Sequence, residues 1–379
     1  MSARPRILSI AGGVAAGAIG AAAAGAAYGV ARRRRVISRR GAGDHTPFGS
    51  LHSPPITVVT DDGVDLHVEV DESAAGGAGS REPELTVVFV HGYSLTLDSW
   101  YFQRAAYRGR VRAVYYDQRS HGRSGRSTPG HATIEQLGRD LLTVLDTVVP
   151  DGPVVLVGHS MGGMTIIALA EEHPELFGDR VVGVGLVSTT AGGLEPHRML
   201  VPLVPSTVGG EFAARLVSAL ARGHRTVDGL RKAGRSVALV ATDELAFGDE
   251  VPESYVRFVD AMLSATPFEV VAEFFPPIAS LDKFRTVKAL SVVPTSIICG
   301  TDDKLTSIGH SRKLHAYISG STLLECDGAG HMVLMERHDE VNTELDRLLE
   351  QVRDGTDHGA DHGADHGADH GADHGAEQG

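Results

Sequence analysis

The sequence predicts an α/β protein with a mostly parallel sheet and helices on both of its faces. Continuous apolar runs, such as Leu85–Val90 and Val181–Val187, are typical of strands that are buried on both faces. Helical patterns stand between these runs, and alternation of strands and helices favours a parallel sheet. Residues 44–356 form a body large enough to bury a core, either as one domain with an insertion or as two smaller domains.

The composition argues against several other classes of protein. A hydrophobic fraction of 42% is too high for a disordered chain. A formal net charge of −13 argues against nucleic acid as a partner, because a phosphate-binding surface needs clustered Lys and Arg. The two cysteines, Cys299 and Cys326, are too few for a disulfide scaffold or a cysteine-based zinc ribbon, and we expect buried reduced thiols.

The sheet is expected to begin with a hairpin, because Asp62-Gly63 is a turn signal between two β-rich runs. Six further strands follow, the last two of them after a long interruption. In chain order the expected strands are Ile56–Thr60, Val64–Val70, Leu85–Val90, Arg112–Tyr116, Val154–Gly158, Val181–Val187, Pro294–Cys299 and Thr322–Cys326.

Three helices are indicated among these strands. The first begins at Thr133, where Thr133 and Gln136 have the spacing of a capping box and apolar residues then repeat on one face. The second spans Met161–Glu172, and the third, Glu340–Val352, closes the body.

One long segment, 195–290, has helical periodicity and no clear strand. A structureless loop of that length would be implausible, so we expect an inserted helical cap. The α/β core is then assigned to 44–194 and 291–356.

Residues 1–43 predict a membrane anchor. From Ile7 to Ala31 the chain has no charge, and a helix of that length rises about 37 Å, enough to span a bilayer. Six arginines follow between Arg32 and Arg40, and the positive-inside rule then places the body in the cytoplasm. We expect a single-pass protein of the cell membrane that associates with it through residues 7–31. The alternative is an Ala- and Gly-rich extension that rests on a membrane or leaves the chain soluble in the cytoplasm.

Residues 357–379 contain the repeat Asp-His-Gly-Ala five times. Such a repeat buries nothing, so this tail is expected to be disordered. Weak binding of a transition metal by its imidazoles is a second interpretation.

A candidate nucleophile lies in the motif G-x-S-x-G at residues 158–162, between an expected strand and an expected helix. The flanking glycines suit a sharp turn that lifts the Ser160 hydroxyl above the carboxyl edge of the sheet. The turn also aims the Met161 N–H at the position where an oxyanion would form. Tyr93, which follows His91-Gly92 directly after a strand, is the candidate for the second N–H donor.

A serine nucleophile needs a histidine base and a carboxylate that orients this base. His331 follows the last expected strand in a glycine-rich loop, and Asp303 follows the strand before it. Asp302 is a competing acid that spacing alone does not eliminate. We favour Asp303 because of the geometry that a short turn after a strand must satisfy.

Three other histidines lie near these loops. His91 is expected to hold its loop by hydrogen bonds, and His159 to support packing or the loop beside the nucleophile. His121 has no second ligand at metal spacing, so we expect a structural role for it. Neither a metal nor a cofactor is expected at the site.

Together these residues resemble the α/β-hydrolase superfamily over about residues 52–353, and most of all its capped bacterial members. The matching segments are the oxyanion loop 91–100, the loop 117–124, the nucleophile elbow 158–163, the acid loop 300–303 and the base loop 328–331. Ser120 departs from the pattern, because Gly is common at its position. The resemblance implies the α/β-hydrolase fold, with an eight-stranded sheet whose strand 2 is antiparallel and a helical cap after strand 6.

The resemblance also implies acyl transfer by Ser160, Asp303 and His331 through an acyl-enzyme. Epoxide hydrolases and haloalkane dehalogenases of the superfamily use Asp as nucleophile, so Ser160 speaks against both. We expect a serine hydrolase, similar to esterases and lipases, that cleaves a small-molecule carboxylic ester with an apolar or lipid acyl group.

Other functions stay open at this point. Thioesterase, lactonase, carbon–carbon bond hydrolase and perhydrolase activities use the same triad. A non-catalytic, membrane-anchored binding protein is a different class, and the intact triad argues against it, because a binding protein needs no strained nucleophile.

Overall fold

The structure, a computed structural model, describes residues 28–41, 43–74, 84–194 and 235–363. An eight-stranded sheet runs through it in the order β1-β2-β4-β3-β5-β6-β7-β8. Its strands are β1 (Pro55–Val59), β2 (Asp65–Asp71), β3 (Thr86–Val90), β4 (Arg112–Tyr116), β5 (Val154–His159), β6 (Val181–Val187), β7 (Thr295–Gly300) and β8 (Thr322–Cys326). β2 is antiparallel to both of its neighbours, and β3 to β8 pair in parallel, which confirms the predicted sheet.

The helices of the core are α2 (Tyr101–Tyr107), α3 (Ile134–Val148), α4 (Met161–Glu172), α11 (Ile308–Tyr317), α12 (Val333–Glu336) and α13 (His338–Gly363). Short 3-10 helices are η1 (Leu97–Trp100), η2 (Pro174–Leu176) and η3 (Thr286–Val292). The Thr133 hydroxyl accepts the N–H of Gln136 and so caps α3, as predicted. The sequence did not indicate α2, α11 or α12.

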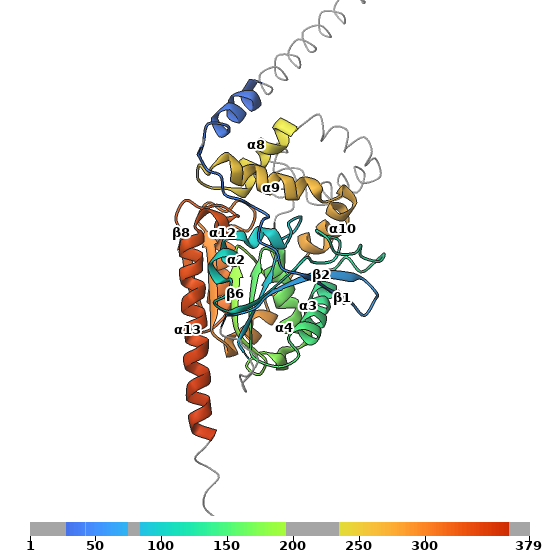
Figure 1. The fold of residues 1–379 in the computed structure, drawn as a ribbon, viewed down its shortest axis with the longest axis vertical. Helices are drawn as coiled ribbons and strands as arrows, with labels where there is room; N and C mark the ends of the chain where they lie inside the picture. The colour runs from blue at the N-terminus through green and yellow to red at the C-terminus, as the bar shows by residue number, and fades with distance from the viewer. Residues whose placement is uncertain (1–27, 42, 75–83, 195–234, 364–379) are drawn as a thin grey trace, which may run out of the picture.

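The two faces of the sheet belong to different helix layers, because successive residues of a strand point to opposite sides. Phe89 of β3 packs in one core with Tyr107 of α2 and Leu348 of α13. Its neighbour Val88 packs in the other core with Leu141 of α3. Figure 1 shows α13 and the pair α3 and α4 on opposite sides of the strands.

The register of the parallel strands aligns their carboxyl ends. Val90 of β3 is opposite Gly158 of β5, and Gly158 is opposite Leu186 of β6. The loops that follow β3 and β5 therefore emerge side by side at one edge of the sheet.

Three cap helices lie over this edge (Figure 1): α8 (Arg235–Ala246), α9 (Glu253–Ala265) and α10 (Phe268–Ala279). Pro252 and Pro267 precede α9 and α10, where the fixed φ of proline suits the start of a helix. The described part of the expected cap is helical, residues 195–234 lie outside the described residues, and the division of the chain into domains stays a prediction.

The arginine-rich segment 28–41 contacts the cap rather than standing apart from it. A helix spans residues 28–37, and its last residue, Ile37, is fully buried. Arg40 Nη1 lies 2.6 Å from Asp243 Oδ1 of α8, and Arg33 Nη2 lies 3.3 Å from Oδ2 of the same buried carboxylate. The arginines that were predicted to mark membrane orientation therefore include two that form ion pairs with the cap.

The prediction of a single-pass membrane protein is wrong by this structure. In the part of the chain that it describes, no helix combines the length and the apolar character that crossing a bilayer requires. The described end of the predicted span, residues 28–31, continues as one helix into the arginines, and Tyr28 is 70% exposed. The rest of that span lies outside the described residues.

The last helix, α13, is longer than the predicted Glu340–Val352 and includes residues 357–363 of the repeat tail. Its apolar face, which contains Val341 and Leu348, is buried, and a helix fixed in this way extends at little further cost. Residues 364–379 lie outside the described residues.

Candidate active site

Ser160 occupies a sharp turn between β5 and α4. Its backbone has φ 53° and ψ −116°, a conformation that residues other than glycine rarely adopt. A Cβ atom at Gly162 would lie 2.0 Å from the carbonyl oxygen of Val90, so the motif needs glycine there. Close backbone packing thus fixes the serine at the carboxyl edge of the sheet.

Asp303 and His331 come together from two neighbouring strand ends. Asp303 follows β7, His331 follows β8, and Asp303 Oδ2 lies 2.9 Å from His331 Nδ1. Burial by itself would raise the pKa of Asp303, but His331 and the N–H groups of Leu305 and Thr306 outweigh it and lower this pKa to about 2. Asp303 is therefore ionised at neutral pH and can accept the Nδ1–H of the imidazole.

Asp302, the competing acid, lies elsewhere. It is exposed, whereas Asp303 is 4% exposed. The backbone N–H of Asp302 donates to the Ala329 carbonyl at 2.9 Å, which anchors the turn beside the base loop. The structure thus brings Asp303 and not Asp302 to the histidine.

Thr306 belongs to this cluster, although the sequence did not indicate it. Its hydroxyl lies 2.9 Å from Asp303 Oδ2, 2.8 Å from the Ser188 carbonyl oxygen and 3.3 Å from His331 Nδ1. A Thr three residues after an Asp is common in ordinary turns, so the sequence held no signal for this role.

Ser160 and His331 line one cavity of about 260 Å³, together with Tyr93 and Met161, the predicted oxyanion donors. The side chains that form most of its wall are apolar and come from the core and the cap: Leu95, Met164, Leu194, Leu245, Ala246, Val259, Leu263, Val271, Phe275, Ile278 and Met332. Among the described residues, no Asp, Glu, Lys or Arg lines the cavity.

The loop after β3 holds Tyr93 at this cavity. His91 Nε2 accepts the N–H of Gln118 at 2.9 Å, and His91 Nδ1 lies 2.8 Å from the Gly92 carbonyl oxygen. Burial lowers the pKa of His91 to about 4, so the ring is neutral at pH 7 and carries its proton on Nδ1. The Tyr93 hydroxyl donates to the Val271 carbonyl of α10, which fixes the loop against the cap. His91 holds its loop, as the sequence predicted.

His159 and His121 also have supporting positions. His159 Nε2 lies 3.0 Å from the His331 carbonyl oxygen, and burial lowers the pKa of His159 to about 3, so its neutral ring donates this hydrogen bond. His121 Nδ1 lies 2.9 Å from the Arg119 carbonyl oxygen. His159 thus supports the backbone of the base loop.

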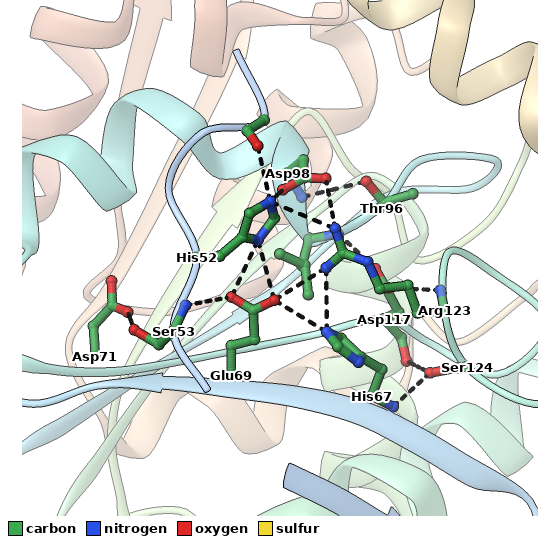
Figure 2. A network of polar contacts seen from close by, with 12 residues as sticks. His52, Ser53, His67, Glu69, Asp71, Thr96, Asp98, Asp117, Arg123 and Ser124 are labelled. Carbon is green, nitrogen blue, oxygen red and sulfur yellow. Dashed lines mark hydrogen bonds and ion pairs between the residues drawn. The ribbon is translucent and has the colours of Figure 1, made fainter. Parts of the chain in front are cut away.

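A polar network joins the oxyanion loop, 91–100, to the loop 117–124 (Figure 2). Asp117, which follows β4, accepts the N–H groups of Leu97 and Arg123, both at 2.8 Å. The Arg123 guanidinium also donates to Glu69 Oε1 at 3.0 Å, and this oxygen lies 3.0 Å from His67 Nε2. None of these side chains lines the cavity, so the network holds the two loops in place and adds no reactive group to it.

One group of described side chains has the spacing of a metal site, formed by Asp61, Asp62 and Asp140. The Arg119 guanidinium already provides a cation there, because its Nε lies 2.6 Å from Asp140 Oδ2 and its Nη1 lies 2.9 Å from Asp62 Oδ2. We therefore interpret it as an ion-pair cluster. Weak metal binding by the repeat histidines stays a prediction, because their side chains lie outside the described part.

The cysteines are free and buried, as expected, and burial raises the pKa of both Cys299 and Cys326 to about 12. They are protonated at neutral pH and are poor nucleophiles.

Comparison with known sequences gives one family and several relatives. The family model described as "Alpha/beta hydrolase family" matches residues 87–344. An uncharacterized protein of Mycobacterium tuberculosis is 27% identical over 278 residues, which are 71% of this chain and 75% of that protein. A non-heme chloroperoxidase of Streptomyces lividans is 25% identical over 299 residues, which are 76% of this chain and 97% of that protein.

Solved structures with the same fold include two hydrolases. A thermophilic esterase from Thermogutta terrifontis has a TM-score of 0.63 at 23% identity, covering 79% of this chain and 99% of the esterase. An enol-lactonase from Burkholderia xenovorans has a TM-score of 0.61 at 24% identity, covering 78% of this chain and 100% of the lactonase. At these identities the likeness concerns the fold.

Proposed function

The chain belongs to the alpha/beta hydrolase family, and on that premise we propose that it is a serine hydrolase that cleaves a carboxylic ester through an acyl-enzyme. The observation that carries the proposal is the arrangement of three side chains. His331 is 2.9 Å from the ionised Asp303 on one side, and it shares a cavity with the strained Ser160 on the other.

The first half of the proposed reaction forms the acyl-enzyme. Asp303 accepts the Nδ1–H of His331, which leaves Nε2 free to take the hydroxyl proton of Ser160. The Ser160 oxygen attacks the ester carbonyl carbon, and the carbonyl oxygen becomes an anion. The backbone N–H groups of Tyr93 and Met161 are the proposed donors to this anion, and Met161 begins α4, whose dipole favours negative charge. The alcohol leaves with the proton from His331.

The second half releases the acid. A water molecule gives a proton to His331 and attacks the acyl carbon, which forms a second tetrahedral anion in the same place. This anion collapses, the bond to Ser160 breaks, and the serine oxygen recovers the proton from His331. The products are the carboxylic acid and the free enzyme.

The cavity supports an uncharged, apolar acyl group. Its described wall has no charged carboxylate, ammonium or guanidinium group that could pair with a charged substrate. An apolar cavity of about 150 Å³ holds a benzene molecule, so the volume of about 260 Å³ here suits an acyl group of roughly ten carbon atoms. Each buried methylene would add about 0.8 kcal/mol to binding.

Labelling by a fluorophosphonate probe tests the nucleophile. The wild type should be labelled and Ser160→Ala should not, while Ser307→Ala should be labelled like the wild type. Ser307 precedes α11 without a side-chain capping bond, so it controls for loss of a serine hydroxyl outside the cavity. If folded wild-type protein is not labelled, the proposal fails and a non-catalytic binding role is favoured.

A series of p-nitrophenyl esters tests the ester and its size. We expect kcat/KM to rise with acyl length to about eight to ten carbons and then to fall, because the cavity is filled at that length. Matched thioesters and lactones belong in the same experiment. Faster turnover of either class than of every oxygen ester would replace the ester assignment.

A further inference from the structure

One partly buried carboxylate near the site has no part in the proposed reaction. Glu336, the last residue of α12, accepts three backbone N–H groups. Its Oε1 accepts the N–H of Gly330 at 2.7 Å, and its Oε2 accepts those of Gly248 and Asp249 at 3.0 Å and 3.1 Å. Hydrogen bonds to an ionised acceptor are roughly twice as strong as those between neutral groups.

These N–H groups belong to two different parts of the molecule. Gly330 directly precedes His331 in the base loop, whereas Gly248 and Asp249 follow α8 in the cap. One side chain therefore ties the loop of the proposed base to the segment directly after α8, the helix whose residues form part of the cavity wall.

The two segments are also in direct backbone contact. A Cβ atom at Gly248 would lie 2.2 Å from the Gly328 carbonyl oxygen, and one at Gly330 would lie 2.4 Å from the Gly248 nitrogen. The Met332 N–H donates to the Ala246 carbonyl at 2.8 Å. Because no side chain separates the segments, a displacement of one is passed directly to the other.

An ordinary ion pair does not account for Glu336. Its neighbour Arg337 directs its guanidinium to Asp249, and its Nε lies 3.6 Å from Glu340. Burial raises the pKa of Glu336, and the three N–H groups and Arg337 only partly offset this rise. Backbone N–H groups of the base loop and the cap are therefore the direct partners of the carboxylate.

We propose that Glu336 is a positioning residue that fixes His331 relative to the cap. This proposal rests on the proposed role of His331 as the base. Both carboxylate oxygens are needed as acceptors, one for each segment. The side-chain amide introduced by Glu336→Gln would not replace them, because its NH₂ group would face an N–H donor.

The test compares Glu336→Gln with Glu340→Gln in the full chain. Glu340 is a carboxylate of α13 that also contacts Arg337, so it is a matched control for loss of charge beside that arginine. Glu336→Gln should lower kcat by about 10²-fold, as expected for a catalytic group displaced by about 1 Å, with little change in KM. It should also shift the acid limb of kcat/KM, which reports the free base. Glu340→Gln should behave like the wild type.

A purely structural role predicts a different result. Glu336→Gln would then lower the thermal unfolding midpoint, while kcat per labelled active site and the acid limb would match the wild type, and this outcome would overturn the proposal. If Glu336→Gln does not fold, Glu336→Asp replaces it, because it keeps the charge but shortens the side chain. A loss of kcat in Glu336→Asp then supports the proposal, and an unchanged kcat overturns it.

Failure of the proposed hydrolase function would be recognised separately, by absence of probe labelling in the wild type. NMR of ¹³C-labelled histidine, with the His331 signal assigned from His331→Gln, follows the ring without any turnover. A changed His331 signal in Glu336→Gln but not in Glu340→Gln supports positioning. An unchanged signal in both overturns it.

Discussion

Asp303→Asn should remove most of the hydrolase activity, whereas Asp302→Asn should leave it nearly intact. Both changes replace an aspartate by its amide in the same turn after β7. They differ in what the carboxylate contacts, because Asp303 lies 2.9 Å from His331 Nδ1 and Asp302 is exposed. The pair therefore separates loss of a local charge from loss of the orienting acid.

The expected size of the loss follows from the hydrogen bonds of Asp303. Its Oδ1 accepts the N–H groups of Leu305 and Thr306 at 2.8 Å and 2.9 Å, and the oxygen of Asn would keep these bonds. The NH₂ group of Asn would then face His331 Nδ1 and favour the tautomer with its proton on Nε2. That tautomer cannot take the Ser160 proton, and an amide in this position of a triad lowers kcat by about 10⁴-fold, or about 5 kcal/mol.

The assay is kcat on a p-nitrophenyl ester of medium acyl length, normalised to the fraction of folded protein. Asp302→Asn should stay within about threefold of the wild type, since surface changes usually alter energies by less than about 0.5 kcal/mol. Equal losses in the two variants, or a larger loss in Asp302→Asn, would show that Asp303 is not the acid that orients the base.

Three further predictions concern backbone packing, pH and the cap. Gly162→Ala should abolish probe labelling and lower the unfolding midpoint, because its Cβ atom would lie 2.0 Å from a backbone oxygen. The control Gly309→Ala should change neither, because the nearest atom to its Cβ would be 3.8 Å away; a Gly162→Ala variant that is stable and labelled would contradict the structure of the elbow. Asp303 and Glu69 have pKa values lowered to about 2 in the folded chain by ion pairs and hydrogen bonds that outweigh their burial. Their contribution to stability should be complete above about pH 5 and be lost as the pH falls towards 2, and urea denaturation midpoints that stay flat over this range would refute it. Asp243→Asn should lower the free energy of unfolding by about 3 kcal/mol, because it leaves the largely buried Arg40 guanidinium without this buried carboxylate. Hydrogen exchange of α8 that stays at the wild-type rate would argue against this ion pair.

The sheet could be predicted from the sequence because strands buried on both faces form continuous apolar runs. Three strands, Arg112–Tyr116, Val181–Val187 and Thr322–Cys326, have the bounds that the apolar and β-rich runs indicate. The same reasoning misses α2, a short helix in which two of the three buried residues are polar. Its Gln103 donates to the Leu334 carbonyl, and its Arg104 donates to Glu69 and Asp71. A helix held by such contacts has no apolar stripe to detect.

In the candidate site, too, the sequence indicates some residues and not others. Ser160 and His331 were identified because the turns that carry them have local constraints, which the sequence displays as glycines. The choice between two consecutive aspartates depends on where each side chain points, and spacing does not encode this. Thr306 contacts Ser188 and His331, and Glu336 contacts Gly248; only the folded chain brings these residues near, so no local pattern marks the contacts.

The arginines near the amino end show that a charge pattern in a sequence cannot be interpreted until the groups that it contacts are known. A cluster of arginines after an apolar stretch fits the positive-inside rule, but it fits equally well an acidic surface elsewhere in the same chain. Arg40 has a largely buried side chain and lies 2.6 Å from Asp243, a carboxylate that is itself buried. Taking both charges out of water would be costly unless they were paired, so this contact is specific docking rather than the incidental pairing of two solvated side chains. Because the adjacent residue, Thr242, lines the cavity, the amino-terminal segment is attached to the same helix that forms part of the wall around the proposed nucleophile.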